Sequence, residues 1–357
     1  MHRPEPAGSL FEQLTSFENL YNAARAARLG KRFKPGAARF HHDIGRSLVD
    51  LRDELREGRY QPGPYRTFTI YEPARRFISA APYRDRVVHH ALCQVMEPLF
   101  ERPFIFDSYA NRVGKGTHRA LDRCRHYACR HKYVLQGDVR LFFPSIDHEI
   151  LLARLGRRIH DRGVMELART IIAHSNEQPP AHFYFPGDDL FTPYERRKGL
   201  PIGNLTSQFW ANVYLDSIDH YFRDELGIPG YIRYVDNFLV FGDDKGQLAG
   251  WLDGARRELE KLRLVLNERE SRIYPVHEGI AFLGFRTYPR GRRLLGHSVK
   301  RARTRMRRLV EAHGRGEIDL RTVSRSVEAW IADASHGDTK GLRRSILSGA
   351  VFRAGRR

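Results

Sequence analysis

The chain is poor in cysteine and has no long apolar run. The first shortage argues against a disulfide-stabilised protein, and the second argues against a membrane-spanning one. Its 357 residues contain three cysteines, Cys93, Cys124 and Cys129, too few for a disulfide framework, which suits a reducing compartment. No signal peptide is recognised, and no apolar run reaches the ~20 residues that a membrane span needs. The sequence therefore predicts a cytoplasmic protein with no membrane partner.

Four potential metal ligands follow one another closely in the chain, at Cys124, His126, Cys129 and His131. A structural zinc site usually contains a Cys-x-x-Cys pair, which this spacing lacks. The segment is also typical of a basic helix, so zinc is the lesser alternative here.

Acidic residues are also in short supply. Against 61 Lys and Arg residues the chain has only 42 Asp and Glu, a formal net charge of +19. The excess is concentrated in residues 290–357, which hold 18 basic and 6 acidic side chains. Salt bridges cannot balance so one-sided a count, and an excess of this size is typical of proteins that bind nucleic acid.

The order of the predicted elements favours an α+β architecture over a regular βα repeat. Helical patterns cover residues 9–29, 40–57, 85–100, 116–130, 147 onward, 204–226, 248–264 and the basic C-terminal part. Strand patterns cover a two-stranded finger at 65–82 around Glu72-Pro73, then residues 133–139, 231–242, 272–276 and 279–287. Residues 177–198 are rich in Pro, Gly and aromatics and predict a long, partly ordered loop.

The segment Tyr-Ile-Arg-Tyr-Val-Asp-Asn-Phe-Leu-Val-Phe-Gly at residues 231–242 predicts a tight hairpin. Two β-prone runs flank Asp236-Asn237, and both residues tolerate the positive φ of a hairpin turn. The pair could be turn chemistry alone. It gains meaning from Asp138, which ends another apolar strand 98 residues earlier. If the two strands are neighbours in one sheet, the carboxylates converge, and such oxygens suit Mg²⁺.

Six segments in one order resemble prokaryotic reverse transcriptases over roughly residues 10–310. They are RRFISAAPYRDRVVHHAL, FIFDSYANRVGKGTHRAL, GDVRLFFPSIDH, GLPIGNLTSQFWANVYL, YIRYVDNFLVFG and GIAFLGF. The first and fourth are most similar to the enzymes of diversity-generating retroelements, which copy a template RNA into error-rich cDNA. The resemblance implies a bacterial or phage protein with a right-hand polymerase fold. Its fingers with N-terminal helices would be residues 1–132, its palm 133–289 with the inserted loop 177–198, and its short helical thumb 290–357.

The resemblance also implies a role for particular residues. Two Mg²⁺ ions, or Mn²⁺ in their place, would be held by Asp138 and Asp236 as catalytic residues, with Val139 and Asn237 beside them. The residues implied in dNTP binding are Arg76, Arg84, Phe143, Ile202, Gly203 and Gln208, and those in primer support are Phe282, Leu283 and Gly284. Surface charge is the alternative for the two arginines, and ordinary packing is the alternative for Phe143 and Ile202. Residues 282–284 would form the turn under the primer terminus, and an ordinary strand segment is the alternative there.

Two residues depart from the family pattern. Asn237 stands where the hairpin normally carries a second Asp, and Glu270 stands where a Lys usually serves the leaving group. Arg269 or Arg272 would have to replace that Lys, although Arg is a poor proton donor. Both departures point toward reduced or specialised activity.

The predicted function is RNA-directed DNA polymerase, with template RNA, primer, cDNA product, dNTPs and a small basic accessory protein as partners. A defence-associated reverse transcriptase is one alternative. A catalytically weak RNA-binding scaffold with the same fold is another. No maturase-like extension is recognised, which favours a retroelement over an intron-encoded enzyme.

Overall fold

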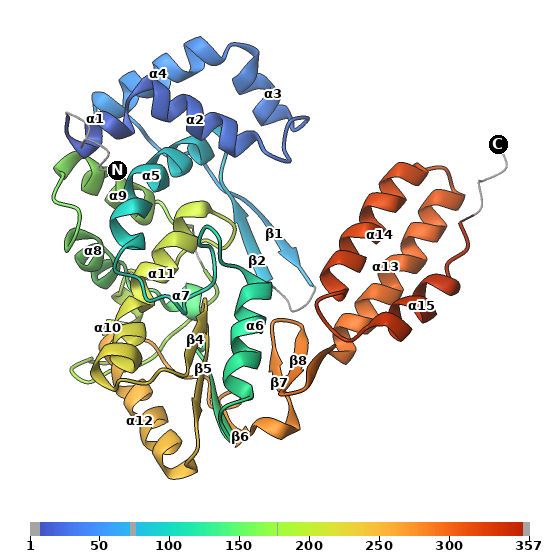
Figure 1. The fold of residues 1–357 in the computed structure, drawn as a ribbon. Coiled ribbons are helices and arrows are strands. Elements are labelled where there is room, and N and C mark those ends of the chain that lie inside the picture. Colours follow the sequence, from blue (N-terminus) through green and yellow to red (C-terminus); the bar gives the residue numbers. More distant parts are fainter. Residues whose placement is uncertain (1–7, 72–75, 177, 353–357) are drawn as a thin grey trace, which may run out of the picture.

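The centre of the protein is a four-stranded antiparallel sheet in the order β4–β5–β3–β6. The computed structural model describes residues 8–71, 76–176 and 178–352 (Figure 1), so the predicted Glu72-Pro73 break lies outside it. The strands are β3 (Tyr133–Asp138), β4 (Tyr231–Tyr234), β5 (Asn237–Gly242) and β6 (Arg272–Pro275). This sheet, with the helices around it, confirms the predicted α+β class.

The packing of β3 against β5 explains why residue 137 is glycine. A Cβ atom there would lie 2.1 Å from the ring of Phe238 on β5, so only glycine lets the two strands pair at this point. The residue that follows it is Asp138. The close approach of the two strands therefore occurs right beside the predicted site.

One large hydrophobic core joins this sheet to the helices that surround it. The covering helices are α5 (Tyr83–Glu101), α8 (His148–Gly156), α9 (Arg162–Ala173), α11 (Leu205–His220) and α12 (Lys245–Lys261), and α11 continues into a π-helical turn at Tyr221–Glu225. Helix α9 and the short α7 (Phe142–Ser145) have no counterpart among the predicted elements. Within the described residues, none of the helices combines the length and the apolarity that a membrane crossing requires.

The two predicted N-terminal helices are each broken once. Residues 9–29 form α1 (Leu10–Leu14) and α2 (Phe17–Arg28), because the Ser16 hydroxyl caps α2 by accepting from the Asn19 amide at 3.2 Å. Residues 40–57 fall in α3 (Pro35–His42) and α4 (Ile44–Arg56), and Asp43 caps α4 in the same way. Short polar residues at these points favour a helix start over a continuous helix.

Two smaller sheets flank the centre. The predicted finger is the pair β1 (Arg66–Ile70) and β2 (Arg76–Ala80). The predicted single strand 279–287 was wrong, because a turn at Leu283–Gly284 divides it into β7 (Ile280–Phe282) and β8 (Phe285–Tyr288). A third strand, β9 (Gly291–Leu294), completes this sheet, and β8 packs against α6 (Thr117–Ala128). A short 3₁₀ turn at Val276–Glu278 links β6 to β7.

The loop 177–198 contains one short helix, α10 (Thr192–Glu195), and is otherwise irregular. The C-terminal helices α13 (Gly296–Gly314), α14 (Leu320–Ala334) and α15 (Lys340–Ser348) form a bundle with a small core of its own (Figure 1). It is attached at two backbone points, where the Gly284 carbonyl accepts from Leu295 and the Arg292 carbonyl from Asp338. The division into fingers, palm and thumb stays a prediction.

Candidate active site

The sheet brings Asp138 and Asp236 to one end of two neighbouring strands. Asp138 pairs with Asn237 in the register of β3 and β5, and Asp236 directly precedes Asn237. The amide of Val139 donates to the backbone carbonyl of Asp236 at 3.3 Å, which ties the two segments together. The convergence of the two carboxylates follows from this antiparallel register.

The hairpin turn itself lies one residue earlier than predicted. Tyr234 pairs with Asn237, so the two turn residues are Val235 and Asp236 rather than Asp236 and Asn237. Val235 has a φ of 57°, a strained backbone state that costs about 1–3 kcal/mol in a β-branched residue. Asp236 is half-buried in this turn and is not an exposed tip.

A cavity of about 480 Å³ opens over these carboxylates. It is lined by eight of the predicted site residues: Arg76, Asp138, Val139, Phe143, Ile202, Asp236, Asn237 and Leu283. Tyr234 also lines this acidic cavity, and its hydroxyl lies 3.1 Å from that of Thr117 at the start of α6. Phe142 and Phe143 both line the cavity; Phe142 is buried and Phe143 is partly exposed.

Backbone strain is concentrated around the acidic cavity. Five non-glycine residues in the described chain have a positive φ, and three of them line it: Leu141, Val235 and Leu283, at 48°, 57° and 48°. Strain of this kind persists only where surrounding structure enforces it, and it gathers at functional sites.

The other predicted site residues lie outside the cavity lining. Arg84 pairs with Glu54 of α4, and its guanidinium lies over the ring of Tyr60 at 5.0 Å. Gly203, at a φ of 120°, and Gln208 follow Ile202, whose carbonyl accepts from the Ser79 amide at 2.9 Å. Phe282 is buried under the β7–β8 turn, and Gly284 receives hydrogen bonds from the start of the C-terminal bundle.

Burial, together with a nearby negative charge, makes both carboxyls hold protons more strongly than usual. Burial, followed by the negative charge of Asp138, raises the pKa of Asp236 to about 6. Burial also raises the pKa of Asp138, Glu270 adds to that shift, and hydrogen bonds from Asn267 and Asn237 oppose it. The amide of Asn267 donates to Asp138 Oδ2 at 2.9 Å. Two close carboxylates of this kind are stabilised by a cation between them.

Comparison with known proteins identifies the family. Residues 72–287, more than half of the chain, match the model of the family described as reverse transcriptase (RNA-dependent DNA polymerase). The chain belongs to the reverse transcriptase family. Its fold class and its predicted resemblance to prokaryotic reverse transcriptases are thereby confirmed.

Several relatives of this reverse transcriptase have curated descriptions. Protein YkfC of Escherichia coli is 28% identical over 282 residues, covering 67% of this chain and 70% of YkfC. The group II intron-encoded protein LtrA of Lactococcus lactis subsp. cremoris is 22% identical and covers 58% of this chain but 32% of LtrA. Truncated apo telomerase from Candida tropicalis is a solved structure with 10% identity and a TM-score of 0.49, covering 68% of this chain and 59% of that one.

The donor set of this reverse transcriptase fits a divalent cation that prefers oxygen ligands. Asp138 and Asp236 offer carboxylate oxygens, and Asn237 offers an amide oxygen. In the part of the chain that the structure describes, no three His, Cys, Asp or Glu side chains form a metal-binding group. Mg²⁺ is often bound by one or two carboxylates together with water and substrate phosphates, so two carboxylates meet its needs.

Three of the four residues considered as zinc ligands, Cys124, Cys129 and His131, are buried or bonded to other groups. Burial raises the pKa of Cys124 to about 12, so its thiol stays protonated. Cys129 donates to the Pro289 carbonyl, and His131 lies 3.2 Å from Asp243.

Sequence reasoning missed a buried ion pair that supports the β4–β5 hairpin around Asp236. Arg233 on β4 binds Asp219 on α11 through two hydrogen bonds, at 2.7 and 2.6 Å, and both residues are at most 1% exposed. Arg233 Nη1 also donates to the carbonyl of the strained Val235 at 3.1 Å. A charge inside an otherwise buried apolar strand was the available signal for this pair.

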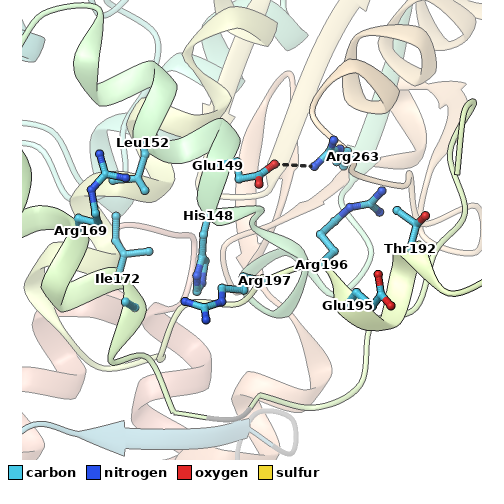
Figure 2. A pocket seen from close by; sticks show the side chains of 11 residues that line it. His148, Glu149, Leu152, Arg169, Ile172, Thr192, Glu195, Arg196, Arg197 and Arg263 are labelled. Carbon is cyan, nitrogen blue, oxygen red and sulfur yellow. Dashed lines mark ion pairs between the residues drawn. The ribbon is translucent and has the colours of Figure 1, made fainter.

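A second cavity also had no counterpart in the prediction. It measures about 540 Å³ and is called the arginine pocket, after its lining residues Arg169, Arg196, Arg197 and Arg263 (Figure 2). The rest of its wall comes from α8, α9 and α10. None of the predicted site residues lies in it.

Proposed function

We propose that this chain is an RNA-directed DNA polymerase that copies a template RNA into cDNA by two-metal nucleotidyl transfer. The observation that carries the proposal is the convergence of Asp138 and Asp236 in one cavity with Arg76 and Phe143. A pure RNA-binding scaffold needs neither converging carboxylates nor an arginine and an aromatic side chain placed over them. Template RNA, primer, cDNA and dNTPs are the partners this function requires.

Asp138 and Asp236 would hold Mg²⁺ or Mn²⁺, with Asn237 and the carbonyl of Val139 as further oxygen donors. The metal supplies charge stabilisation to the attacking and leaving oxygens of the displacement. Arg76 binds the triphosphate, because a guanidinium forms paired hydrogen bonds with phosphate oxygens. Its charge also acts on Asp236, where it lowers the carboxyl pKa against the larger opposing effects of burial and Asp138.

The remaining cavity residues select and orient the substrates. Phe143 blocks the position of a ribose 2′-hydroxyl and thereby favours deoxynucleotides. Ile202 faces the nascent base pair, with Gly203 and Gln208 supporting its loop. Leu283 contacts the primer terminus from the turn that Phe282 and Gly284 hold in place. For Arg84 we infer a structural role rather than triphosphate binding, since its ion pair with Glu54 links α5 to α4.

Within the family, we assign the chain to the diversity-generating retroelements, with a small basic accessory protein as a further partner. The assignment is supported by the RRFISAAPYRDRVVHHAL and GLPIGNLTSQFWANVYL segments. Apolar Ile202 offers no hydrogen bond to the base pair, which accords with loose base selection. Sequencing the cDNA tests this, because Ile202→Gln is expected to lower the substitution frequency. An error frequency already low in the wild type would instead favour the defence-associated alternative.

The deciding experiment is Mg²⁺- and Mn²⁺-dependent dNTP incorporation on a primed RNA template. We expect incorporation by the wild type and none by Asp138→Ala or Asp236→Ala. Both variants should still bind RNA, because neither side chain supplies positive charge.

The second candidate is a catalytically weak scaffold, which Asn237 and Glu270 favour. Asn237 removes one negative charge from the hairpin, and Glu270 stands where a proton donor is usual. Absence of incorporation with either metal, with RNA bound equally by wild type and variants, would support this candidate. Co-purified RNA and any partner protein are added back before that result is accepted.

A further inference from the structure

The arginine pocket lies directly behind the wall of the acidic cavity. His148 at the start of α8 donates its Nε2–H to the Gly199 carbonyl at 2.8 Å, and the neighbouring Leu200 amide donates to the Phe143 carbonyl at 2.9 Å. Phe143 lines the acidic cavity, and His148 lines the arginine pocket. The backbone around Gly199 therefore separates the two cavities, and a volume of about 540 Å³ accommodates a nucleotide.

Two of the pocket's four arginines are fixed by buried carboxylates. Arg196 pairs with Asp188 and, at 3.6 Å, with Asp147, which is fully buried. Arg263 donates to the same Asp147 at 2.7 Å and lies 3.6 Å from Glu149. Arg263 also has a φ of 53°, so the pocket contains a strained residue of its own. These two side chains form a rigid wall.

The other two arginines carry the uncompensated charge. Arg169 and Arg197 are exposed, and neither has an ion pair among the described residues. Figure 2 shows them on either side of His148, with Ile172 close by, whereas Glu195 and Thr192 lie at the opposite end of the pocket. Two guanidinium groups beside an apolar wall match a phosphate and the sugar or base attached to it.

The loop that supplies part of the pocket's lining also carries exposed aromatic side chains. Tyr184, Phe191 and Tyr194 are 53%, 64% and 63% exposed, and all three lie in the loop that supplies Thr192 and Arg196 to the lining. The ring of Tyr194 is stacked on that of His182 at 4.3 Å, which holds it in place. Large exposed aromatic groups gathered in one loop mark an interaction surface.

We propose that the arginine pocket and this aromatic loop form a second contact for single-stranded nucleic acid, separate from the acidic cavity. A backbone phosphate binds between Arg169 and Arg197, and neighbouring bases stack on Phe191 and Tyr194. Cationic grooves with aromatic platforms are the usual construction of such contacts, and the net charge of +19 favours a polyanion. The proposal takes from the proposed function only the identity of the partner, RNA.

The test is fluorescence anisotropy of a labelled single-stranded RNA, without dNTP or divalent metal, over a range of salt concentrations. We expect the double variant Arg169→Ala/Arg197→Ala to lose about tenfold or more in affinity. Its salt slope should fall by about 0.7 for each phosphate that the variant no longer neutralises. The matched control is Arg157→Ala/Arg158→Ala, which removes the same charge from exposed positions outside the pocket.

A second variant tests the aromatic loop without changing charge. Phe191→Ala/Tyr194→Ala should weaken RNA binding by about tenfold at high salt as well as low, because stacking does not depend on counterion release. Thermal unfolding establishes that each variant is folded. Equal affinities for the pocket variant and its charge-matched control would overturn the proposal, and so would an aromatic variant with unchanged affinity.

Competition with inorganic phosphate and ATP distinguishes a strand from a free nucleotide. We expect both to compete only at high concentration. Tight binding of ATP that depends on Arg169 and Arg197, with RNA affinity unchanged in the variants, would also overturn the strand assignment. Because no step here requires polymerisation, an inactive wild type that still shows the variant effects would count against the proposed function alone.

Discussion

The acidic cavity and the arginine pocket lie back to back and are built in opposite ways. The acidic cavity takes its charged groups from strand ends and tight turns, where the backbone register alone brings Asp138 beside Asp236. The arginine pocket takes its charges from helix faces and a loop, and buried Asp147 orients two of them. In the first cavity like charges are forced together, whereas in the second each fixed cation has a partner.

This difference indicates which property a substitution near each cavity should change. Forced proximity of two carboxylates needs a rigid support, and Arg233 supplies it through the Val235 carbonyl. Long arginine side chains adapt to a ligand and need no such support. Substitutions near the acidic cavity should therefore affect chemistry, and those near the arginine pocket should affect binding.

The largest expected effect is a loss of dNTP incorporation without a loss of RNA binding. Asp138→Asn or Asp236→Asn should reduce dNTP incorporation by about a thousandfold, since metal charge stabilisation is worth several kcal/mol. The same variants should keep the wild-type affinity for single-stranded RNA within about twofold, because the charge they remove is negative. Single-turnover incorporation and anisotropy measure the two quantities. A parallel loss of both would erase the distinction between the cavities.

The support of the hairpin is tested by removing the buried ion pair in two steps. Arg233→Met leaves Asp219 buried without a partner and should cost about 3–5 kcal/mol of unfolding free energy. The double variant Asp219→Leu/Arg233→Met should regain most of that stability in urea unfolding, since apolar side chains can replace a buried pair.

Incorporation should nevertheless stay low in the double variant, because Val235 has lost its donor. Tyr231→Phe is the control, as it removes only the hydroxyl bond to Asp219 at 2.8 Å. A stable double variant with wild-type incorporation would make Arg233 a stability element and nothing more.

Asn237→Asp sharpens the comparison by adding a third carboxylate to the acidic cavity, where Asp138 and Asp236 already repel each other. The added carboxylate should lower the Mg²⁺ concentration for half-maximal incorporation by about tenfold, as substitutions beside a metal ligand often shift affinity by 10–100-fold. Without metal the same variant should unfold more easily than the wild type. An unchanged Mg²⁺ dependence would mean that residue 237 does not influence the cation.

The smallest effect concerns Asp216, next to the Arg233–Asp219 pair. Burial, followed by the charge of Asp219, raises the pKa of Asp216 to about 6, well above its value of 3.8 in an unfolded chain. Between these values the unfolded chain releases a proton that the folded chain keeps, so this residue lowers stability as pH rises from about 4 to 6.

Asp216→Asn should therefore stabilise the protein by about 1–2 kcal/mol near pH 7 and by nothing near pH 4. Urea unfolding at the two pH values measures the difference. An equal gain at both would rule out titration as its cause.

Much of the acidic cavity was predictable because its signals are local. Asp138 ends an apolar strand, and Asp236 lies in a two-residue turn between β-prone runs, so strand pairing sufficed to bring them together. The turn was misplaced by one residue because Asn237 tolerates positive φ better than Val235. Tertiary hydrogen bonds to the Asp236 and Val235 carbonyls outweigh that local preference.

The features that the sequence did not predict depend on contacts between distant segments. Arg84 lies near Arg76 in sequence, yet Glu54 from another helix binds it. Arg169, Arg197 and Arg263 come from three separate segments, and nothing in their spacing distinguishes them among 61 basic residues. The two broken N-terminal helices show the same limit on a smaller scale, since the apolar periodicity continues across Ser16 and Asp43, which cap the starts of α2 and α4.

The strained residues around the acidic cavity also bear on how the protein could be engineered. Leu141, Val235 and Leu283 each hold a backbone state that glycine adopts without strain. A designer seeking cDNA synthesis at higher temperature would be tempted to replace them with glycine. Each replacement would also increase the conformational freedom of the unfolded chain and loosen the backbone beside a cavity-lining group that we propose to act in catalysis or primer support. Thermal tolerance in this protein is better sought in the C-terminal bundle, whose small core lies apart from the carboxylates.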